Sequence, residues 1–527
     1  MKKQLLYYLL VCFSSALVAQ SSGWVFFTDK QHSALPDTYF DDYAKARKDR
    51  LAIAYPAASD LPVSDFYLSS VVRVADTVWG ASRWLNAAAI TATPAQWAEI
   101  ARLPFVKETF LQSTGTHLTH RAQEWPPLSD SDSVLLAYQT RRLGVRHWQQ
   151  AGITGKGVRV GVVDGGFKGV DVHPSFAHLR EEGRILATYD FLRQDSSVYG
   201  YSSHGTAVLS CIAGRYGDSM LIGVAPEVEV VLARTEYGIR ENIQEELAWI
   251  QAIEWMDRFG VSIINASLGY TNKRYFQEEM DGRTSPIVRA ANQAVQKGIL
   301  IVNSSGNEGD GSWGTLGTPA DGDSVLTVGA TNPYTDIATS FSSPGPTADR
   351  RLKPNVTAPG IVVGATPKGM GETAGTSFSS PLVAGFAACL LQSRPALTPI
   401  ALLRAVEEAG HLYPYYDYHH GYGVPIASKA LGRHTVDTSS FIIQPSGEYI
   451  NINVNEAYLP ERDDEDRLLS PPKHLYYHIA DTDGNLRQYR VIAAVEEEAY
   501  FIEKEQLQPG DILRVHFEGV TKTYTAP

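Results

Sequence analysis

One serine of this chain stands where a hydroxyl could become a nucleophile. Ser377 lies in the segment Gly-Thr-Ser-Phe-Ser-Ser-Pro (375–381), directly before small apolar residues that predict a buried helix. Pro381 suits the first turn of that helix, where a missing N–H costs little. A hydroxyl at a helix N-terminus lies among unpaired N–H groups in a positive field, which stabilises an oxyanion. Alone, the segment indicates only a capped helix, so any chemistry depends on partners elsewhere.

Three candidate partners precede the serine. Asp164 ends a β-branched run that predicts a buried parallel strand, and ligands gather at the carboxyl ends of such strands. His204 opens a second apolar run; its imidazole can take a proton from serine and return it, provided that a carboxylate fixes its tautomer. Asn307 follows another apolar run, and its amide could donate to an oxyanion beside the Ser377 N–H. Taken singly, each is more simply a turn or capping residue.

The order of these residues carries a family resemblance. The aspartate comes first, then the histidine, then the serine, which is the order of subtilisin and not that of chymotrypsin or the α/β-hydrolases. Six blocks follow one another: V-V-D-G-G-F, S-H-G-T-A-V, G-V-A-P, N-A-S-L-G, S-S-G-N-E-G and G-T-S-F-S-S-P. Each block is weak alone, but together they resemble the subtilase (subtilisin-like, family S8) serine peptidases over residues 140–432.

The resemblance implies a secreted serine endopeptidase, made as a zymogen, that hydrolyses polypeptide substrates through an acyl-enzyme. Ser377 would be the nucleophile, His204 the general base and then acid, and Asp164 its orienter. Asn307 would help to form the oxyanion hole. An inert scaffold used for adhesion would have lost one of these residues, and none is lost. A transacylase, or a processing enzyme with one partner, stays open.

The resemblance also implies where substrate binds. Ser267, Leu268 and Gly269 would form an edge strand that pairs with the backbone of an extended peptide. Gly317 would lie at the floor of the pocket for the residue before the scissile bond, because any side chain there would fill that pocket.

We expect no required cofactor or metal. Several subtilases place an acidic calcium ligand after a His-Pro pair, but here His173 and Pro174 are followed by Ser175. A structural calcium ion stays open, although no oxygen-ligand spacing stands out. Three aspartates could bind a hard cation, with surface turns as their simpler role: Asp171, Asp218 and Asp323.

The N-terminus has the pattern of a secretory signal over residues 1–19. Lys2 and Lys3 precede an apolar stretch, 5–18, and Ala19-Gln20 is the expected cleavage point. A true N-terminal anchor is the alternative. No other apolar stretch approaches about 18 residues, so we expect no membrane span after leader removal and a secreted, extracellular or cell-surface protein.

The charge of the chain limits its binding partners, and its few cysteines limit its disulfides. The 527 residues include 46 Lys and Arg against 58 Asp and Glu, a net charge of −12. This balance argues against a nucleic-acid or anionic-membrane partner. Beyond the leader only Cys211 and Cys389 remain. We favour buried free thiols for both, and a disulfide between them stays open.

Residues 20–115 predict a separate α+β domain. A strand-like stretch near 84–91 precedes a capping box, Thr93 to Gln96, that begins a helix, and 105–111 predicts another strand. This unit resembles the family's propeptide, which acts as folding chaperone and inhibitor; a permanent N-terminal domain is the alternative. Residues 116–139 would be the linker. We expect maturation cleavage between about Leu111 and Leu136, by the enzyme itself.

The rest predicts two further folds. Strands and helices alternate over 140–432, which indicates a doubly wound α/β parallel sheet. The expected strands are 185–191, 228–233, 262–267, 299–303 and 325–329, and the expected helices 241–259, 286–297, 378–391 and 398–409. Apolar and polar residues alternate over 449–456, and Asp483-Gly484 is a hairpin signal, so we expect a small β-sandwich over 436–527. Its role in secretion, carbohydrate binding or surface binding stays open.

Overall fold

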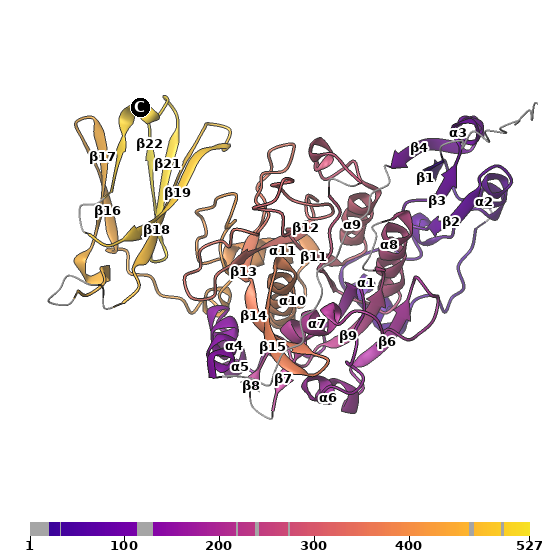
Figure 1. The fold of residues 1–527 in the computed structure, drawn as a ribbon, viewed down its shortest axis with the longest axis horizontal. Coiled ribbons are helices and arrows are strands. Elements are labelled where there is room, and N and C mark those ends of the chain that lie inside the picture. The colour runs from indigo at the N-terminus through magenta and orange to yellow at the C-terminus, as the bar shows by residue number, and fades with distance from the viewer. Residues whose placement is uncertain are drawn as a thin grey trace, which may run out of the picture.

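The computed structural model describes residues 20–31, 33–112, 130–217, 220–237, 242–271, 274–462, 468, 470–496 and 500–527. The predicted signal segment, 1–19, and the linker residues 116–129 lie outside this set. Three parts follow one another along the chain: an N-terminal α+β domain, a central domain built on a parallel sheet, and a C-terminal pair of antiparallel sheets at the left of Figure 1.

The N-terminal domain is a four-stranded antiparallel sheet of order β2-β3-β1-β4 with short helices. The predicted capping box forms: the Thr93 hydroxyl accepts from the backbone N–H of Gln96, and the Gln96 side chain accepts from the backbone N–H of Thr93. The elements are β1 (Ser21–Phe27), α1 (Asp42–Arg50), α2 (Asp65–Val72), β2 (Thr77–Ser82), β3 (Ala87–Ala92), α3 (Pro94–Ile100) and β4 (Val106–Gln112).

Seven parallel strands form the central sheet in the order β13-β12-β11-β10-β5-β9-β6. Successive apolar residues of these strands enter two different cores, one on each face of the sheet. The strands are β5 (Arg159–Asp164), β6 (Ile185–Asp190), β9 (Glu229–Arg234), β10 (Ile263–Ala266), β11 (Leu300–Ser304), β12 (Val325–Thr331) and β13 (Val356–Pro359). The predicted doubly wound α/β fold is confirmed.

Helices cover both faces of this sheet. α7, α10 and α11 pack in one core, and α8 and α9 in the other. The helices of the domain are α4 (Asp130–Arg142), α5 (Val145–Gln150), α6 (Ala177–Glu181), α7 (His204–Ala213), α8 (Ile243–Asp257), α9 (Pro286–Gln296), α10 (Thr376–Ser393), α11 (Pro399–Glu408) and α12 (Ala427–Ala430). Two hairpins complete it, β7 (Arg215–Tyr216) with β8 (Met220–Leu221), and β14 (Ile361–Thr366) with β15 (Gly369–Ala374).

Helix α4 begins inside the range predicted as linker. Leu135 and Leu136 are buried in the core of the central domain. Gln139 is also buried, and its side-chain amide donates to the carbonyls of Ile222 and Val363 at 3.0 and 3.2 Å. Ser131, Asp132 and Ser133 stand in the first turn of this helix, where acidic residues are favourable.

The N-terminal sheet packs on α8. Trp24 and Phe26 share a core with Leu247 and Ile250 of that helix. On the same helix, the buried Glu254 carboxylate accepts from the Ser82 hydroxyl at 2.5 Å and from the backbone N–H groups of Arg83 and Trp84 at 3.1 and 3.0 Å. Burial raises the pKa of Glu254 against these hydrogen bonds.

A second attachment lies at the amino edge of the central sheet, and we call it the amino-edge contact. Arg47 and Lys48 of α1 both pair with Asp257 at the end of α8, the lysine at 2.9 Å, and all three side chains are buried. Lys297, just after α9, pairs with Asp60 of the N-terminal domain. The N-terminal domain is therefore held by buried charge pairs as well as by its sheet.

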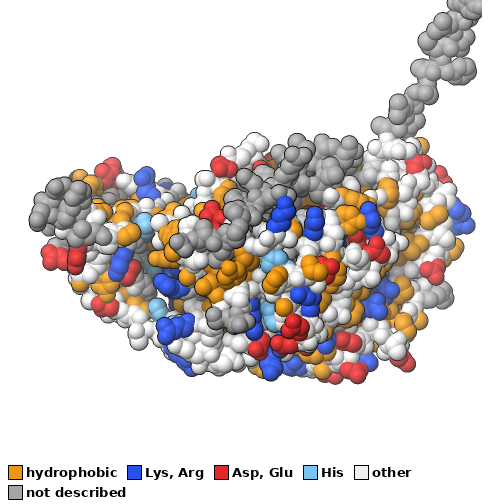
Figure 2. Space-filling view, turned by 60° about the horizontal axis from the view of Figure 1, so that its bottom comes forward, with side chains coloured by type: hydrophobic (Ala, Val, Ile, Leu, Met, Phe, Trp, Pro, Cys, Tyr) orange, Lys and Arg blue, Asp and Glu red, His pale blue; other side chains and the backbone are white. Residues whose placement is uncertain are grey.

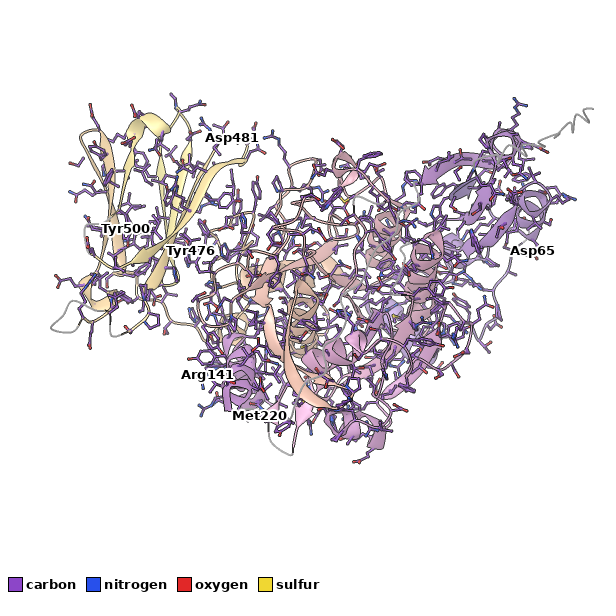
Figure 3. The ribbon with its side chains drawn as sticks, viewed as in Figure 1. Asp65, Arg141, Met220, Tyr476, Asp481 and Tyr500 are labelled. Atoms are coloured by element: carbon purple, nitrogen blue, oxygen red, sulfur yellow. The ribbon has the colours of Figure 1, made fainter. Side chains whose placement is uncertain are left out.

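Two antiparallel sheets face each other at the C-terminal end, as the predicted β-sandwich requires. Their inner faces share one apolar core. The strands are β16 (Phe441–Ser446), β17 (Tyr449–Val454) and β20 (Tyr500–Glu503) in one sheet, and β18 (Lys473–Ala480), β19 (Leu486–Ala494), β21 (Ile512–Phe517) and β22 (Val520–Thr525) in the other. Tyr476 lies on the side toward the central domain (Figure 3), 5.8 Å from the buried Tyr415 ring.

The surface carries mixed charge, and the two described cysteines are not joined. Acidic and basic side chains are interspersed over the face seen in Figure 2. Within the described residues no helix has the length and hydropathy needed to cross a membrane. Cys211 and Cys389 are both free and buried, and burial raises the pKa of the Cys211 thiol to about 12.

Candidate active site

An aspartate and a histidine meet at the carboxyl edge of the central sheet. Asp164 is the last residue of β5 and is fully buried, and His204 is the first residue of α7. The Nδ1 atom of His204 lies 3.0 and 2.9 Å from the two carboxylate oxygens. An ionised carboxylate only accepts hydrogen bonds, so Nδ1 carries the proton and Nε2 is left as an acceptor. This is the tautomer that a general base requires.

Glycine permits this approach. A Cβ atom on Gly205 would lie 2.5 Å from the Gly166 carbonyl oxygen and 2.9 Å from Asp164 Cβ. Neither neighbour can move without displacing the strand end, so the residue after the histidine has no room for a side chain.

Two opposing effects set the pKa of His204. Burial alone would lower it, because an imidazolium loses hydration. The charge of Asp164 and its hydrogen bond act in the other direction and raise the pKa above its ordinary value. The imidazolium form is therefore stabilised, as it must be when the ring takes up a proton.

The serine lies in the first turn of α10, and here the sequence prediction was wrong in one respect. The helix begins at Thr376 and not after the serine, so Pro381 is inside the helix. Gly375 precedes it with φ 146° and ψ 154°, a conformation that favours glycine. Because Pro381 has no N–H, the Ser377 carbonyl lacks its helical donor and accepts the Ser267 hydroxyl instead, at 2.8 Å.

The serine hydroxyl points to a backbone carbonyl. Ser377 Oγ donates to the Ser267 carbonyl over 3.4 Å. No hydrogen bond joins Ser377 to His204 within the described part of the chain, although the His204 ring lies 5.5 Å from the ring of Phe378, the next residue. Proton transfer thus requires the hydroxyl to leave this carbonyl for His204 Nε2, and catalytic hydrogen bonds are often unmade in free enzymes.

Asn307 has a fixed orientation. Its side-chain oxygen accepts from the backbone N–H and from the hydroxyl of Thr376, both at 2.9 Å. The amide nitrogen therefore points the other way, toward Gly375, where a Cβ atom would lie 3.4 Å from it. The donor group of the side chain is thus presented beside the turn that carries Ser377.

The expected edge strand at Ser267, Leu268 and Gly269 is absent from the described structure, because β10 ends at Ala266. Ser267 and Leu268 are buried and Gly269 is exposed. A strand needs a hydrogen-bonded neighbour, and the expected neighbour of this segment is a bound peptide. No role for the Ser267 side chain followed from the sequence, although Pro381, four residues after Ser377, signals a carbonyl that lacks its helical donor.

Gly317 packs against backbone. Its neighbour Thr318 forms an antiparallel bridge with Tyr270, and a Cβ atom on Gly317 would lie 3.1 Å from the Tyr270 carbonyl oxygen. The close approach of these two segments explains the glycine, and its place at a pocket floor stays a prediction.

The residues after the His-Pro pair do not fit a calcium ion. The Ser175 hydroxyl is buried against the Met370 sulfur at 3.5 Å, and His173 Nε2 lies 2.9 Å from the Gly369 carbonyl oxygen. Hard cations prefer several oxygen ligands, usually with carboxylates. Asp323 pairs with Arg351 at 3.0 Å, and Asp218 lies outside the described residues. No cluster of three or more His, Cys, Asp or Glu that could hold a metal occurs in the described ranges.

Comparison with known proteins gives two family matches. The model of the "Subtilase family" matches residues 155–423, and that of the "Peptidase S8 propeptide domain, Bacteroidota" matches residues 22–125. The first range contains all eight predicted site residues, and the second covers the N-terminal sheet apart from Ser21, the first residue of β1.

Two relatives agree with the first of these matches, and one solved structure is also similar in sequence. Serine protease AprX of Bacillus subtilis (strain 168) is 33% identical over 276 residues, which are 47% of this chain and 60% of AprX. Subtilisin DY of Bacillus licheniformis is 31% identical over 253 residues, 47% of this chain and 82% of the relative. A solved structure of a cold adapted subtilisin-like serine proteinase is 26% identical with a TM-score of 0.41, covering 51% of this chain and 87% of its own.

The opposing effects on His204 can be separated by titration. NMR of the Ser377→Ala protein should give a His204 pKa above 6.5, and Asp164→Asn in the same background should bring it below 6.5, since burial is then the main effect left. The raised pKa of His204 also stabilises the folded state. This stabilisation is complete at pH values below the pKa of His204 in the unfolded chain, and it is lost as pH rises through the higher pKa of His204 in the folded protein. Asp171→Asn, an exposed carboxylate, is the control. Equal His204 pKa values with and without Asp164 would contradict this account.

Proposed function

Because the chain belongs to the subtilase family, Peptidase S8, we propose that it is a secreted serine endopeptidase that uses Asp164, His204 and Ser377 as its catalytic triad. The observation that carries the proposal is the buried Asp164 carboxylate on His204 Nδ1, which leaves Nε2 as a base at the edge where Ser377 lies. An isolated turn or capping histidine would have no need of a buried carboxylate.

The chemistry follows in two halves. Ser377 Oγ attacks the peptide carbonyl carbon while His204 Nε2 takes its proton, and Asp164 stabilises the imidazolium. The oxyanion accepts from the Asn307 side-chain amide and from the Ser377 N–H. The C–N bond then breaks as His204 returns its proton to the leaving amine. Water attacks the acyl-enzyme with His204 again as base, and the acid product and the free serine are restored.

An extended peptide would bind beside Ser267, Leu268 and Gly269. This segment has no strand neighbour, and Gly269 is exposed. A peptide added there is tied to the nucleophile through Ser267, which bonds the Ser377 carbonyl. Polypeptides are therefore the substrate class, and substrate hydrogen bonds to main chain would leave selectivity to side-chain pockets.

The N-terminal domain would act as chaperone and inhibitor. Its match to a propeptide model and its buried contacts with α8 support this role. Export with removal of residues 1–19, and activity outside the cell or at its surface, complete the proposal.

A serine-directed probe tests the activity. A fluorophosphonate should label processed protein at Ser377, and Ser377→Ala should lose the label and about 10⁶-fold of kcat on peptides. Ser312→Ala, an exposed serine of the same domain, should keep both. Absent labelling, under conditions that label a control serine peptidase, would favour the inert scaffold. Labelling with acyl transfer only to amines would favour the transacylase.

The oxyanion donor has its own test. Asn307→Asp keeps the side-chain oxygen that Thr376 needs but removes the NH₂ donor and adds a negative charge. We expect kcat to fall by about 100- to 1000-fold or more with KM little changed, because the interaction forms only in the transition state. Asn332→Asp, at a turn outside the site, is the matched control. A loss confined to KM would remove Asn307 from the oxyanion hole.

Self-processing predicts a difference between two preparations. Mass spectrometry of protease-free Ser377→Ala protein should find residues 20–115 still attached, whereas active protein should be cut between about 111 and 136. Adding a trace of active enzyme to the variant shows whether cleavage also occurs between molecules. If the pure variant still loses its first domain, another peptidase performs maturation.

A further inference from the structure

The last residue of β4 is buried in the central domain. Gln112, the final residue described before 113–129, is 6% exposed and lies among three side chains of the central domain. Glu246 comes from α8, and Arg274 and Tyr275 come from the loop that follows β10. We call these three side chains the carboxamide pocket.

The pocket satisfies every polar atom of a glutamine side chain. Gln112 Nε2 donates to a Glu246 carboxylate oxygen at 2.7 Å and to the Tyr275 hydroxyl at 2.9 Å. Its Oε1 accepts from Arg274 Nη2. A primary amide has two N–H donors and one oxygen, so donor, acceptor and shape all match.

The pocket residues also hold one another. Glu246 is fully buried, its other oxygen accepts from the Tyr275 hydroxyl at 2.8 Å, and Arg274 Nε lies 2.8 Å from that same oxygen. These contacts do not involve Gln112, so the three side chains support one another independently of the occupant. Without a polar occupant, the second Glu246 oxygen and the Tyr275 hydroxyl lose a buried partner, and such losses are costly.

Two residues of the pocket, Arg274 and Tyr275, lie on the segment that begins at Ser267, the residue hydrogen-bonded to the nucleophile. The carbonyl of Ser267 accepts from Ser377 Oγ. Three residues later comes Tyr270, whose ring centre lies 5.9 Å from the Arg274 guanidinium. Leu268 and Tyr275 share one apolar core. Gln112 lies at the N-terminal end of the range expected for self-cleavage, about 111 to 136, so any cut after Gln112 leaves it on the N-terminal side of the scissile bond.

We propose that the carboxamide pocket is a specificity site that selects glutamine on the N-terminal side of the cleaved bond, and that Gln112 occupies it until the N-terminal domain leaves. This inference rests on the proposed peptidase function. A glutamate in the same place would bring a second carboxylate against Glu246, and a lysine would meet Arg274. Leucine would leave the buried polar atoms unpaired, which a hydrogen-bonding site discriminates against strongly.

Matched peptides test the inference with unaltered enzyme. A peptide of residues 106–120 should bind processed enzyme, measured by inhibition of a reporter peptide's cleavage, about 10-fold or more tightly than the same peptide with Gln112→Leu or Gln112→Glu. A library of quenched peptides scanned on the N-terminal side of the cleavage point should show a similar glutamine preference in kcat/KM at one position.

A variant assigns the preference to the pocket. Tyr275→Phe should lower both kcat/KM for glutamine peptides and the preference for glutamine over leucine, the preference by about 10-fold, because the substrate amide loses one of its hydrogen-bond partners. Tyr334→Phe, an exposed tyrosine, should change neither.

Several results would overturn the inference. One is cleavage with no glutamine preference at any scanned position. Others are equal binding of the three 106–120 peptides and a preference untouched by Tyr275→Phe. Failure of the proposed function looks different, since no peptide would then be cut and the fluorophosphonate would not label Ser377.

Discussion

The site depends on the attachment of α10 to the end of β10. This helix is buried over nearly its whole length and packs on β10, β11 and β12. Two side-chain hydrogen bonds fasten its first turns: Ser267 bonds the Ser377 carbonyl that Pro381 leaves without a donor, and Ser380 bonds Asn265 at 2.8 Å. The nucleophile and the peptide-binding segment therefore share one rigid support, which is what positioning a reaction requires.

Helix α8 recognises the N-terminal domain with two buried carboxylates. Glu246 and Glu254 stand two turns apart on one face, with the apolar Leu247 and Ile250 near them. Glu254 accepts from two backbone N–H groups and a hydroxyl, whereas Glu246 accepts from the Gln112 side chain. The first contact is made mostly to main chain, with the Ser82 hydroxyl as its one side-chain donor, whereas the second depends on the side-chain amide of Gln112. The second contact is therefore the one that implies selectivity for a side chain.

Sequence predicted the elements well and the contacts between them poorly. The order Asp164, His204, Ser377 and the buried strand that ends at Asp164 indicated a site at one sheet edge, and the structure joins the aspartate and the histidine there. The start of α10 was misplaced because a proline was taken for a first-turn residue. Gln112 had no signal at all, because a polar residue at a strand end is ordinary until its partners, more than 130 residues later, are seen to surround it.

The amino-edge contact separates cleavage of the chain from departure of the N-terminal domain. Each of its charge pairs joins a residue that precedes any cut beyond Gln112 (Arg47, Lys48 or Asp60) to a residue that follows the cut (Asp257 or Lys297). Scission of the backbone breaks none of them, so the severed fragment stays bound until these pairs and the α8 contacts open together. The interval between scission and departure is thus set by the dissociation rate of a non-covalent complex, and it gives the molecule a built-in delay.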